Sequence, residues 1–409
     1  MKDTELYAHL LGLTSPWHVG HVDLDVKAQR VSVYAEHRRD TNFSCPECGL
    51  ACPLHDHDEE RSWRHLDSCQ FETHLHARIP RVRCDEHGVR QARVPWAEPK
   101  SRFTLMFERF AIDVLRETDV LGATRILRIS WDQAHHLMQR AVARGLARRE
   151  QAPIKYIGID EKAIAKRHRY ATLLNDLEHG VVLEVVDGRT KESAKACLDS
   201  IPREQLERVE AFAMDMWPAY FHTVSRVVTD GARKVVFDRF HIVGHMNKAL
   251  DIVRRRENRA LLTDGDTRLV GTKYDFLRGA ERVDDNLRQK LVSMRDAGLK
   301  TARAWSMKEL LRGLWDCKSE RRAREWWSTW YFWATHSRLP PVIKVAKMIQ
   351  RHLPNVLSYF THRITNAASE AINAVVRGLQ KRAFGFRSFS NFRVAVLFRC
   401  GGLALYPAT

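Results

Sequence analysis

The sequence lacks a long apolar run, a secretory signal and the cysteine content of a disulfide framework. No uncharged run of about eighteen apolar residues occurs, so we expect no membrane span. The first five residues, 1–5, are mostly charged or polar and contain no apolar core of a signal peptide. The chain has 409 residues and eight cysteines, five of which precede residue 85. This distribution indicates local metal binding in a reducing compartment, and we expect a soluble, cytoplasmic protein.

Acidic residues are a minority among the charged residues. The chain has 50 Asp and Glu against 67 Lys and Arg, which gives a net charge of +17. The basic residues are spread over the whole chain and are not confined to one tail. This pattern favours an extended polyanion such as nucleic acid over a membrane surface, because no long basic amphipathic helix stands out. The length suggests about three structural units.

Two predicted strands end in an aspartate on a face lined by small residues. In the run 155–162, Lys-Tyr-Ile-Gly-Ile-Asp-Glu-Lys, alternation puts Asp160 on the face of Gly158 and points Glu161 the other way. Asp215 follows the apolar run 211–214 in the same manner. Ligands of open α/β sheets bind at the carboxyl ends of strands, and divalent metals favour carboxylate oxygens. The alternative is that each aspartate is a turn or helix-capping residue.

A Cys-x-x-Cys pair and a Cys-x-x-His pair suggest a zinc site in the first quarter of the chain. Cys45, Cys48, Cys84 and His87 supply three thiolates and an imidazole, which suits a closed tetrahedral structural site. The spacing between the pairs is longer than in common zinc fingers, so other ligand sets stay open. The competing residues are Cys52, Cys69, His55, His57, His65, His74 and His76.

Helical periodicity begins near Arg102 and lasts to Arg149. An apolar stripe predicts a first buried helical face, formed by Phe103, Phe107, Phe110, Ala111, Val114 and Leu115. After a short helix and a turn, Ser130 and Gln133 form a possible capping box for a further helix. The polar residues Gln133, His136 and Arg140 would then face DNA bases, as in a helix-turn-helix. An ordinary three-helix bundle is the alternative.

The remainder of the chain alternates strands and helices and then becomes helical. Three strands in meander, then helix, strand, helix and strand, follow the order of a ribonuclease-H-like α/β core. Residues 260 to about 350 carry no strand pattern. They contain a stripe of Trp326, Trp330 and Trp333, which is expected to be core, with stacking on an unpaired base as the alternative.

A final amphipathic helix is predicted after Asn366, a good N-cap residue, and ends at about Lys381. Its expected buried stripe is Ile372, Val375, Val376 and Leu379, and its opposite face carries Glu370, Asn373, Arg377 and Lys381. Glu370 could complete a metal site while the basic residues hold a phosphate backbone. A solvated amphipathic helix is the alternative.

Taken in order, these motifs resemble the ISL-three family of bacterial insertion-sequence transposases. The resemblance covers residues from about 40 to 400 and includes Asp238-Arg239-Phe240-His241 between the second and third acids, with Gly385-Phe386 after the final helix. It implies a DDE transposase in which Asp160, Asp215 and Glu370 hold Mg²⁺ or Mn²⁺. At the position of His87 the family more often has a cysteine.

The fold class implied is a multidomain α/β protein with a ribonuclease-H-like catalytic core. The expected parts are a zinc module at 1–98, a helix-turn-helix domain at 99–150, the core at 151–259 and 353–409, and an all-helical insertion at 260–352. The implied partners are the double-stranded DNA of the element's ends and of the target, bound by a homo-oligomer in a bacterial cytoplasm. The implied activity is strand cleavage and strand transfer by a two-metal mechanism.

Two other functions stay open at this stage. One is a DNA-binding regulator with a zinc module and a helix-turn-helix, which needs no converging acids. The other is a structure-selective nuclease of ribonuclease-H type that cuts DNA without joining it.

Overall fold

The computed structural model describes residues 2–150, 152–165 and 169–408, which form two compact units. The first unit comprises Met1–Arg149 together with Leu403–Thr409, and the second comprises Glu150–Gly402. None of the helices in the described ranges is both long and apolar enough to cross a membrane.

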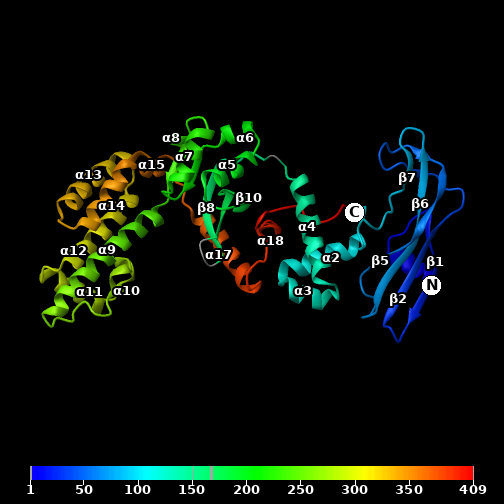
Figure 1. Ribbon diagram of the computed structural model, residues 1–409, viewed down its shortest axis with the longest axis horizontal. Helices are drawn as coiled ribbons and strands as arrows, with labels where there is room; N and C mark the ends of the chain where they lie inside the picture. The colour runs from blue at the N-terminus through cyan, green and yellow to red at the C-terminus, as the bar shows by residue number, and fades with distance from the viewer. Residues whose placement is uncertain (1, 151, 166–168, 409) are drawn as a thin grey trace. The chain divides into compact units, whose positions relative to one another are not determined.

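The first unit begins with a five-stranded sheet of order β1-β2-β6-β5, with β7 paired to β6 (Figure 1). Alternating apolar residues bury one face of this sheet, where Val33, Trp63 and Leu75 are almost fully covered. The elements are α1 (Asp3–Leu10), β1 (Trp17–Asp25), β2 (Arg30–His37), β3 (Phe43–Ser44), β4 (Ala51–Cys52), β5 (Leu54–Arg64), β6 (Glu72–Cys84) and β7 (Gly88–Gln91).

Three helices complete the first unit: α2 (Leu105–Glu117), α3 (Val120–Leu127) and α4 (Trp131–Ala147). Each starts at a side-chain cap, and the capping box predicted for Ser130 and Gln133 is confirmed at the start of α4. The expected apolar stripe of α2 is buried at Phe107, Ala111 and Leu115, but Phe110 is 46% exposed and was assigned wrongly to it. Three-helix packing covers only one side of a short helix, and Phe110 lies outside that side.

A five-stranded sheet of order β10-β9-β8-β11-β12 is the centre of the second unit. The first three strands are antiparallel neighbours, while β11 and β12 run parallel to β8. The predicted succession of a meander followed by alternating helices and strands is confirmed. The strands are β8 (Tyr156–Ala165), β9 (Arg169–Asp176), β10 (Val181–Asp187), β11 (Ala211–Met214) and β12 (Val235–Phe237).

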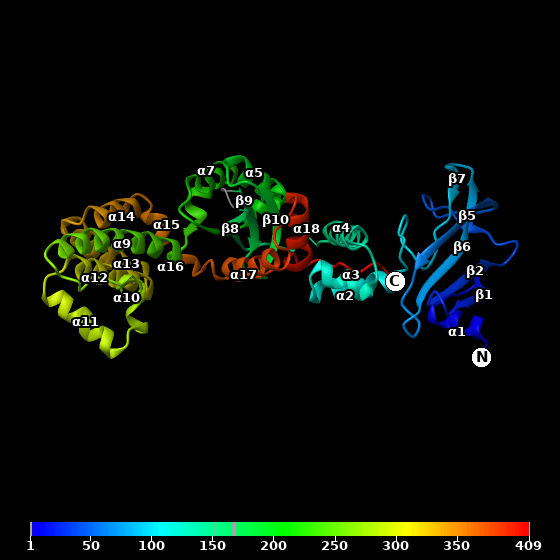
Figure 2. The ribbon, with the colours of Figure 1, turned by 60° about the horizontal axis from the view of Figure 1, so that its bottom comes forward.

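Helices cover both sides of this sheet. Figure 2 shows α5 and α7 on one side and α17 on the other. Gly158 of β8 permits the close approach of α17, since a Cβ there would lie 2.5 Å from Ser369 Oγ. The helices are α5 (Lys191–Asp199), α6 (Arg203–Arg208), α7 (Pro218–Val227), α8 (Gly231–Lys234), α17 (Ala367–Arg382) and α18 (Phe389–Cys400).

Between residues 260 and 352, all of which are described, the chain forms helices and turns without a strand. The long helix α9 leads from the sheet into these helices (Figure 1), and both share one continuous apolar core. Trp330 is fully buried in that core, whereas Trp326 is 37% exposed and donates its indole N–H to the Leu310 carbonyl. The helices are α9 (Arg239–Thr263), α10 (Lys273–Leu277), α11 (Asp285–Asp296), α12 (Lys300–Arg312), α13 (Glu320–His336), α14 (Pro340–Arg351), α15 (Leu353–Leu357) and α16 (Tyr359–His362), with 3-10 turns at Ala280–Arg282 and Gly313–Asp316.

Candidate carboxylate and zinc sites

Three aspartates follow one row of paired residues across the parallel strands. Ile159 of β8 pairs with Met214 of β11, and Met214 pairs with Phe237 of β12. The next residue on each strand is Asp160, Asp215 or Asp238. Because neighbouring residues in a sheet register point to the same face, the three carboxyl groups converge. The first two aspartates are predicted metal ligands, and Asp238, from the Asp-Arg-Phe-His motif, is the competitor of Glu370 for the role of third acid.

A histidine joins this row from the first turn of α9. His241 Nδ1 lies 2.7 Å from an oxygen of Asp215, and its Nε2 lies 3.9 Å from an oxygen of Asp238. Burial lowers the pKa of His241, but the hydrogen bond with Asp215 and the surrounding carboxylates outweigh this effect and raise it above its usual value. The imidazolium therefore offsets part of the negative charge of the cluster.

The carboxyl groups of the cluster are strongly desolvated. Burial, followed by the charge of Asp215, raises the pKa of Asp160 to about 7. Burial also raises the pKa of Asp238 to about 6. One oxygen of Asp215 and one of Asp238 are buried without a hydrogen-bond partner among the described residues. Buried carboxylate oxygens with unused acceptor capacity are the donor set that a hard divalent cation takes up.

Helix α17 is fastened to β8 beside the cluster. The Asn373 amide donates a hydrogen bond of 2.6 Å to Asp160, and the Lys162 ammonium donates to the Asn373 carbonyl at 2.8 Å. Glu370, one turn earlier on α17, is exposed, and its charge contributes to the raised pKa of Asp238. Glu370 is thus electrostatically coupled to the cluster, although the compact group of ligand atoms consists of Asp215, Asp238 and His241.

The start predicted for α17 is confirmed, but its predicted buried face is wrong. Asn366 is the N-cap residue, although its side chain makes no capping hydrogen bond and is buried with neither amide atom paired among the described residues. Val375 is 44% exposed, while Asn373 faces the strand. The helix therefore presents Ser369, Ile372 and Val376 to the sheet, a face rotated from the one expected.

Glu161 is oriented away from the cluster, as alternation along β8 predicts. Its carboxylate pairs with Arg189 at 3.1 Å. The Arg189 guanidinium in turn stacks on the rings of Tyr170 and Trp217, at 3.9 and 4.8 Å from their centroids. Glu161 thus has a complete set of partners of its own, which separates it chemically from Asp160.

In the first unit, the four residues predicted to hold zinc lie together. The ligand atoms of Cys45, Cys48, Cys84 and His87 are all within 4.8 Å of one another. The short β3–β4 hairpin and the turn between β6 and β7 bring them there. A backbone hydrogen bond from His87 lowers the pKa of the Cys84 thiol, which favours the thiolate that zinc requires. Among the competing residues, Cys69 is exposed and His65 bonds Thr104.

The predicted base-reading residues line one groove of the helical part of the first unit. Gln133, His136 and Arg140 of α4 share a groove of about 590 Å³ with Lys100 and Arg102 from the segment before α2. His136 is exposed, whereas Arg140 also pairs with Glu98 at 2.8 Å and lies 3.8 Å from the buried Glu108. Lys100 and Arg102 were not predicted to contact DNA, because they precede α2 and lie outside the helix expected to read bases.

Comparison with protein families agrees with this order of parts. Residues 157–396, more than half of the chain, match a transposase family of the ISL3 group. Residues 41–87 match the zinc finger of the IS204, IS1001, IS1096 and IS1165 transposases. Residues 92–142 match the helix-turn-helix domain of transposase family ISL3. The zinc-finger match spans all four clustered ligands.

Relatives extend over nearly the full length. The chain is 25% identical to a transposase for insertion sequence element IS1001 from Bordetella parapertussis, over 85% of this chain and 86% of the relative. It is 26% identical to a transposase for insertion sequence element IS1557 from Mycobacterium tuberculosis, over 95% of this chain and 93% of the relative. The family matches bear out the resemblance read from the sequence, including the zinc and DNA-binding parts. The chain therefore belongs to the ISL3 family and is a DDE-type insertion-sequence transposase.

Proposed function

We propose that the second unit has a ribonuclease-H-like core in which Asp160, Asp215 and Glu370 hold two Mg²⁺ or Mn²⁺ ions. The sheet order supports this, since a three-stranded antiparallel meander followed by two parallel strands is the topology expected of such a core. The observation that carries the proposal is the convergence of Asp160 and Asp215 from paired strands, with one buried oxygen of Asp215 that has no hydrogen-bond partner among the described residues.

The bound metals would activate a water or a 3′-hydroxyl and stabilise the leaving oxygen during in-line attack on a phosphodiester. The residues of the chain prepare the site for this chemistry. Asn373 fixes the orientation of Asp160 through its amide, and His241 does the same for Asp215 through Nδ1. The second oxygen of Asp215 has no hydrogen-bond partner among the described residues, whereas the second oxygen of Asp160 accepts a hydrogen bond from the Glu161 backbone N–H.

The substrate of this chemistry is the DNA of the element's ends, which are cleaved and then joined to a target. We propose that zinc held by Cys45, Cys48, Cys84 and His87 builds the amino-terminal module, because three thiolates and an imidazole form a closed set for this ion. The groove residues Gln133, His136 and Arg140 would read base edges at the ends.

Phosphate contacts near the catalytic site are proposed for Arg377 and Lys381, which are exposed on α17. Asn373 was predicted as a third DNA contact, but its amide is engaged by Asp160, and we assign it to positioning that carboxylate. We further propose a homo-oligomer on DNA, since two ends must be processed together, acting in the cytoplasm of a bacterium.

The proposal is tested by strand cleavage and joining on a labelled end duplex with Mg²⁺ or Mn²⁺. Alanine variants of Asp160, Asp215 and Glu370 should each abolish both reactions, because a site lacking one ligand no longer positions the metals. Binding of the duplex should persist. Glu161→Gln, whose parent carboxylate pairs with Arg189 away from the cluster, is the matched control and should remain active.

The same experiment examines the third acid and the alternative functions. If Glu370→Ala cleaves normally while Asp238→Ala is inactive, the third metal-holding acid is Asp238. Cleavage without joining in the unaltered protein would instead point to a nuclease. Binding of the ends without either reaction would point to a DNA-binding regulator.

A further inference from the structure

The last part of the second unit is almost free of acidic residues. Between residues 326 and 402 the sequence contains eleven Lys and Arg but a single acid, Glu370. The whole chain, by comparison, has about three acids for every four basic residues. An excess of this size within one continuous segment marks a surface built to meet a polyanion.

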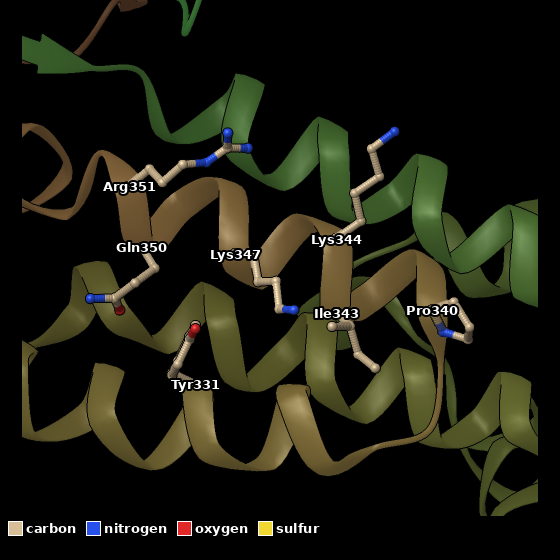
Figure 3. Close-up of a pocket in the computed structure, with 7 residues that line it drawn as sticks. All are labelled: Tyr331, Pro340, Ile343, Lys344, Lys347, Gln350 and Arg351. Atoms are coloured by element: carbon tan, nitrogen blue, oxygen red, sulfur yellow. The ribbon is translucent and has the colours of Figure 1, made fainter.

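One group of exposed basic residues in this segment lies on α14. Lys344, Lys347 and Arg351 are all exposed and are spaced three and four residues apart, so they form one row along the helix. They line an open groove of about 720 Å³ together with Tyr331 of α13 and Gln350. Figure 3 shows the three basic side chains following one another along α14, with Lys347 on the side of Tyr331.

We call Lys344, Lys347 and Arg351 the basic row. Among the described residues, no carboxylate lies within ion-pair distance of any of the three. The neighbouring helix α13 differs in this respect. Its arginines 321, 322 and 324 are also exposed, but each is within 3.9 Å of Glu320 or Glu325. Like charges three and four residues apart destabilise a helix, so an uncompensated row favours binding of an external anion.

We propose that the basic row binds the phosphate backbone of a DNA duplex. From Lys344 to Arg351 the row extends about 10 Å along the helix axis, enough to meet about three successive phosphates of one strand. The Tyr331 hydroxyl and the Gln350 amide can add neutral hydrogen bonds along the groove. The contact is independent of base sequence, because ammonium and guanidinium groups that meet phosphates carry no base information. This inference rests on DNA as the partner and is independent of which acids hold metal.

The test measures binding of the full-length protein to DNA by fluorescence anisotropy across a range of salt concentrations. The triple variant Lys344→Gln, Lys347→Gln, Arg351→Gln should make the slope of log K against log salt less steep by about 2 to 3, since each phosphate contact contributes about 0.9. The loss should occur with an end duplex and with an unrelated duplex. A loss confined to the end duplex would contradict the proposal, because the contact would then depend on base sequence.

The matched control is Arg321→Gln, Arg322→Gln, Arg324→Gln, which removes the same charge from the paired arginines of α13 and should leave the slope unchanged. An unchanged slope in the triple variant of the basic row, or an equal reduction in the control, overturns the proposal. If the triple variant does not fold, Lys344→Gln alone should lower the slope by about 0.9. Alanine variants of Asp160 and Glu370 should keep the full slope, so failure of the catalytic assignment is distinguishable from failure of this one.

Discussion

The two clusters proposed to bind metal are built on opposite principles. In the first unit, Cys45, Cys48, Cys84 and His87 converge with four ligand atoms for one ion and leave no position for a substrate. In the second unit, Asp215 and Asp238 keep buried oxygens without a protein partner beside the exposed Glu370. A closed set of soft ligands stabilises a fold, whereas an open set of hard ligands leaves metal coordination positions for the oxygens of a phosphodiester.

The energetics of the clusters differ in the same direction. Around β3 and β4, Phe43, Cys45 and Cys52 are buried in the core of the first unit. A zinc site rarely exists preformed in an unfolded chain, so the free energy of zinc binding there should add to the free energy of folding. Without metal, the carboxylate cluster lowers the stability of the second unit, because it brings negative charges together where they are desolvated. The raised pKa of Asp160, caused first by burial and then by Asp215, expresses this cost.

Loss of zinc should have the largest effect on stability. Removing a structural zinc ion forfeits about 10 kcal/mol or more of apparent binding free energy. We expect Cys45→Ser or Cys84→Ser to lower the zinc content from about one ion per chain, measured by metal analysis, and to unfold the amino-terminal module. Cys69→Ser, which changes an exposed thiol, is the control. Unchanged zinc content in both ligand variants would reject this ligand set.

In metal-free protein, the free energies of unfolding of the two units should change with pH in opposite directions. A folded pKa of about 7 for Asp160, raised from 3.8, means that the folded state holds its proton more tightly than the unfolded chain. The free energy of unfolding of the second unit should therefore fall as pH rises from about 4 to 7. In the first unit, burial lowers the pKa of His65 to about 4, so its contribution to stability should be lost as pH falls from 6.5 to 4.

Hydrogen exchange of metal-free protein can follow the two regions separately. Peptides from β8 and β11 should lose protection as pH rises, after correction for intrinsic exchange, and peptides from β5 and β6 should lose it as pH falls. Asp160→Asn should flatten the first trend, whereas Asp187→Asn, at an exposed carboxylate ending β10, should not. Equal trends in the two regions would contradict the proposed desolvation of the cluster.

A smaller effect is expected from crowding the contact between β8 and α17. In Gly158→Ala the new Cβ would lie 2.5 Å from Ser369 Oγ and 2.7 Å from a methyl of Leu177, and such overpacking costs about 1–3 kcal/mol. A shift of α17 by about 1 Å would displace Asn373 and Glu370, and cleavage should fall by about 100-fold. Gly378→Ala, on the same helix with nothing within 4 Å of the new Cβ, should leave cleavage intact.

Periodicity and spacing predicted most elements, but they predicted contacts between elements less well. Alternation in 155–162 separated Asp160 from Glu161, and local capping chemistry located the start of α4 at Ser130. The third aspartate of the row depends on the pairing of β12 with β11, which joins residues far apart in sequence. Local patterns carry no record of such a register, so the sequence alone could not place Asp238 beside Asp215.

The face of α17 shows the same limit. A 3.6-residue period defines an apolar stripe, but the position of Gly158 decides which part of it meets the sheet. The close approach there turns Ser369 and Asn373 inward and leaves Val375 exposed. Asn366 shows a related limit, because it occupies the predicted N-cap position but its buried side chain makes no capping bond.

The smallest expected effect concerns sequence recognition by the groove beside α4, in contrast to the sequence-independent contacts proposed for the second unit. His136→Ala should lower the preference for an end duplex over a scrambled duplex by about 1 kcal/mol, close to fivefold, because one base contact is lost. The salt slope should not change, since no phosphate contact is removed. Competition anisotropy measures both quantities.

Arg140→Ala should lower the preference and also the melting temperature of the first unit, because it leaves Glu98 and the buried Glu108 with one cation fewer. Gln139→Ala, on the same helix but outside the groove, is the control. If that control loses end preference while His136→Ala keeps it, α4 reads DNA with a different face.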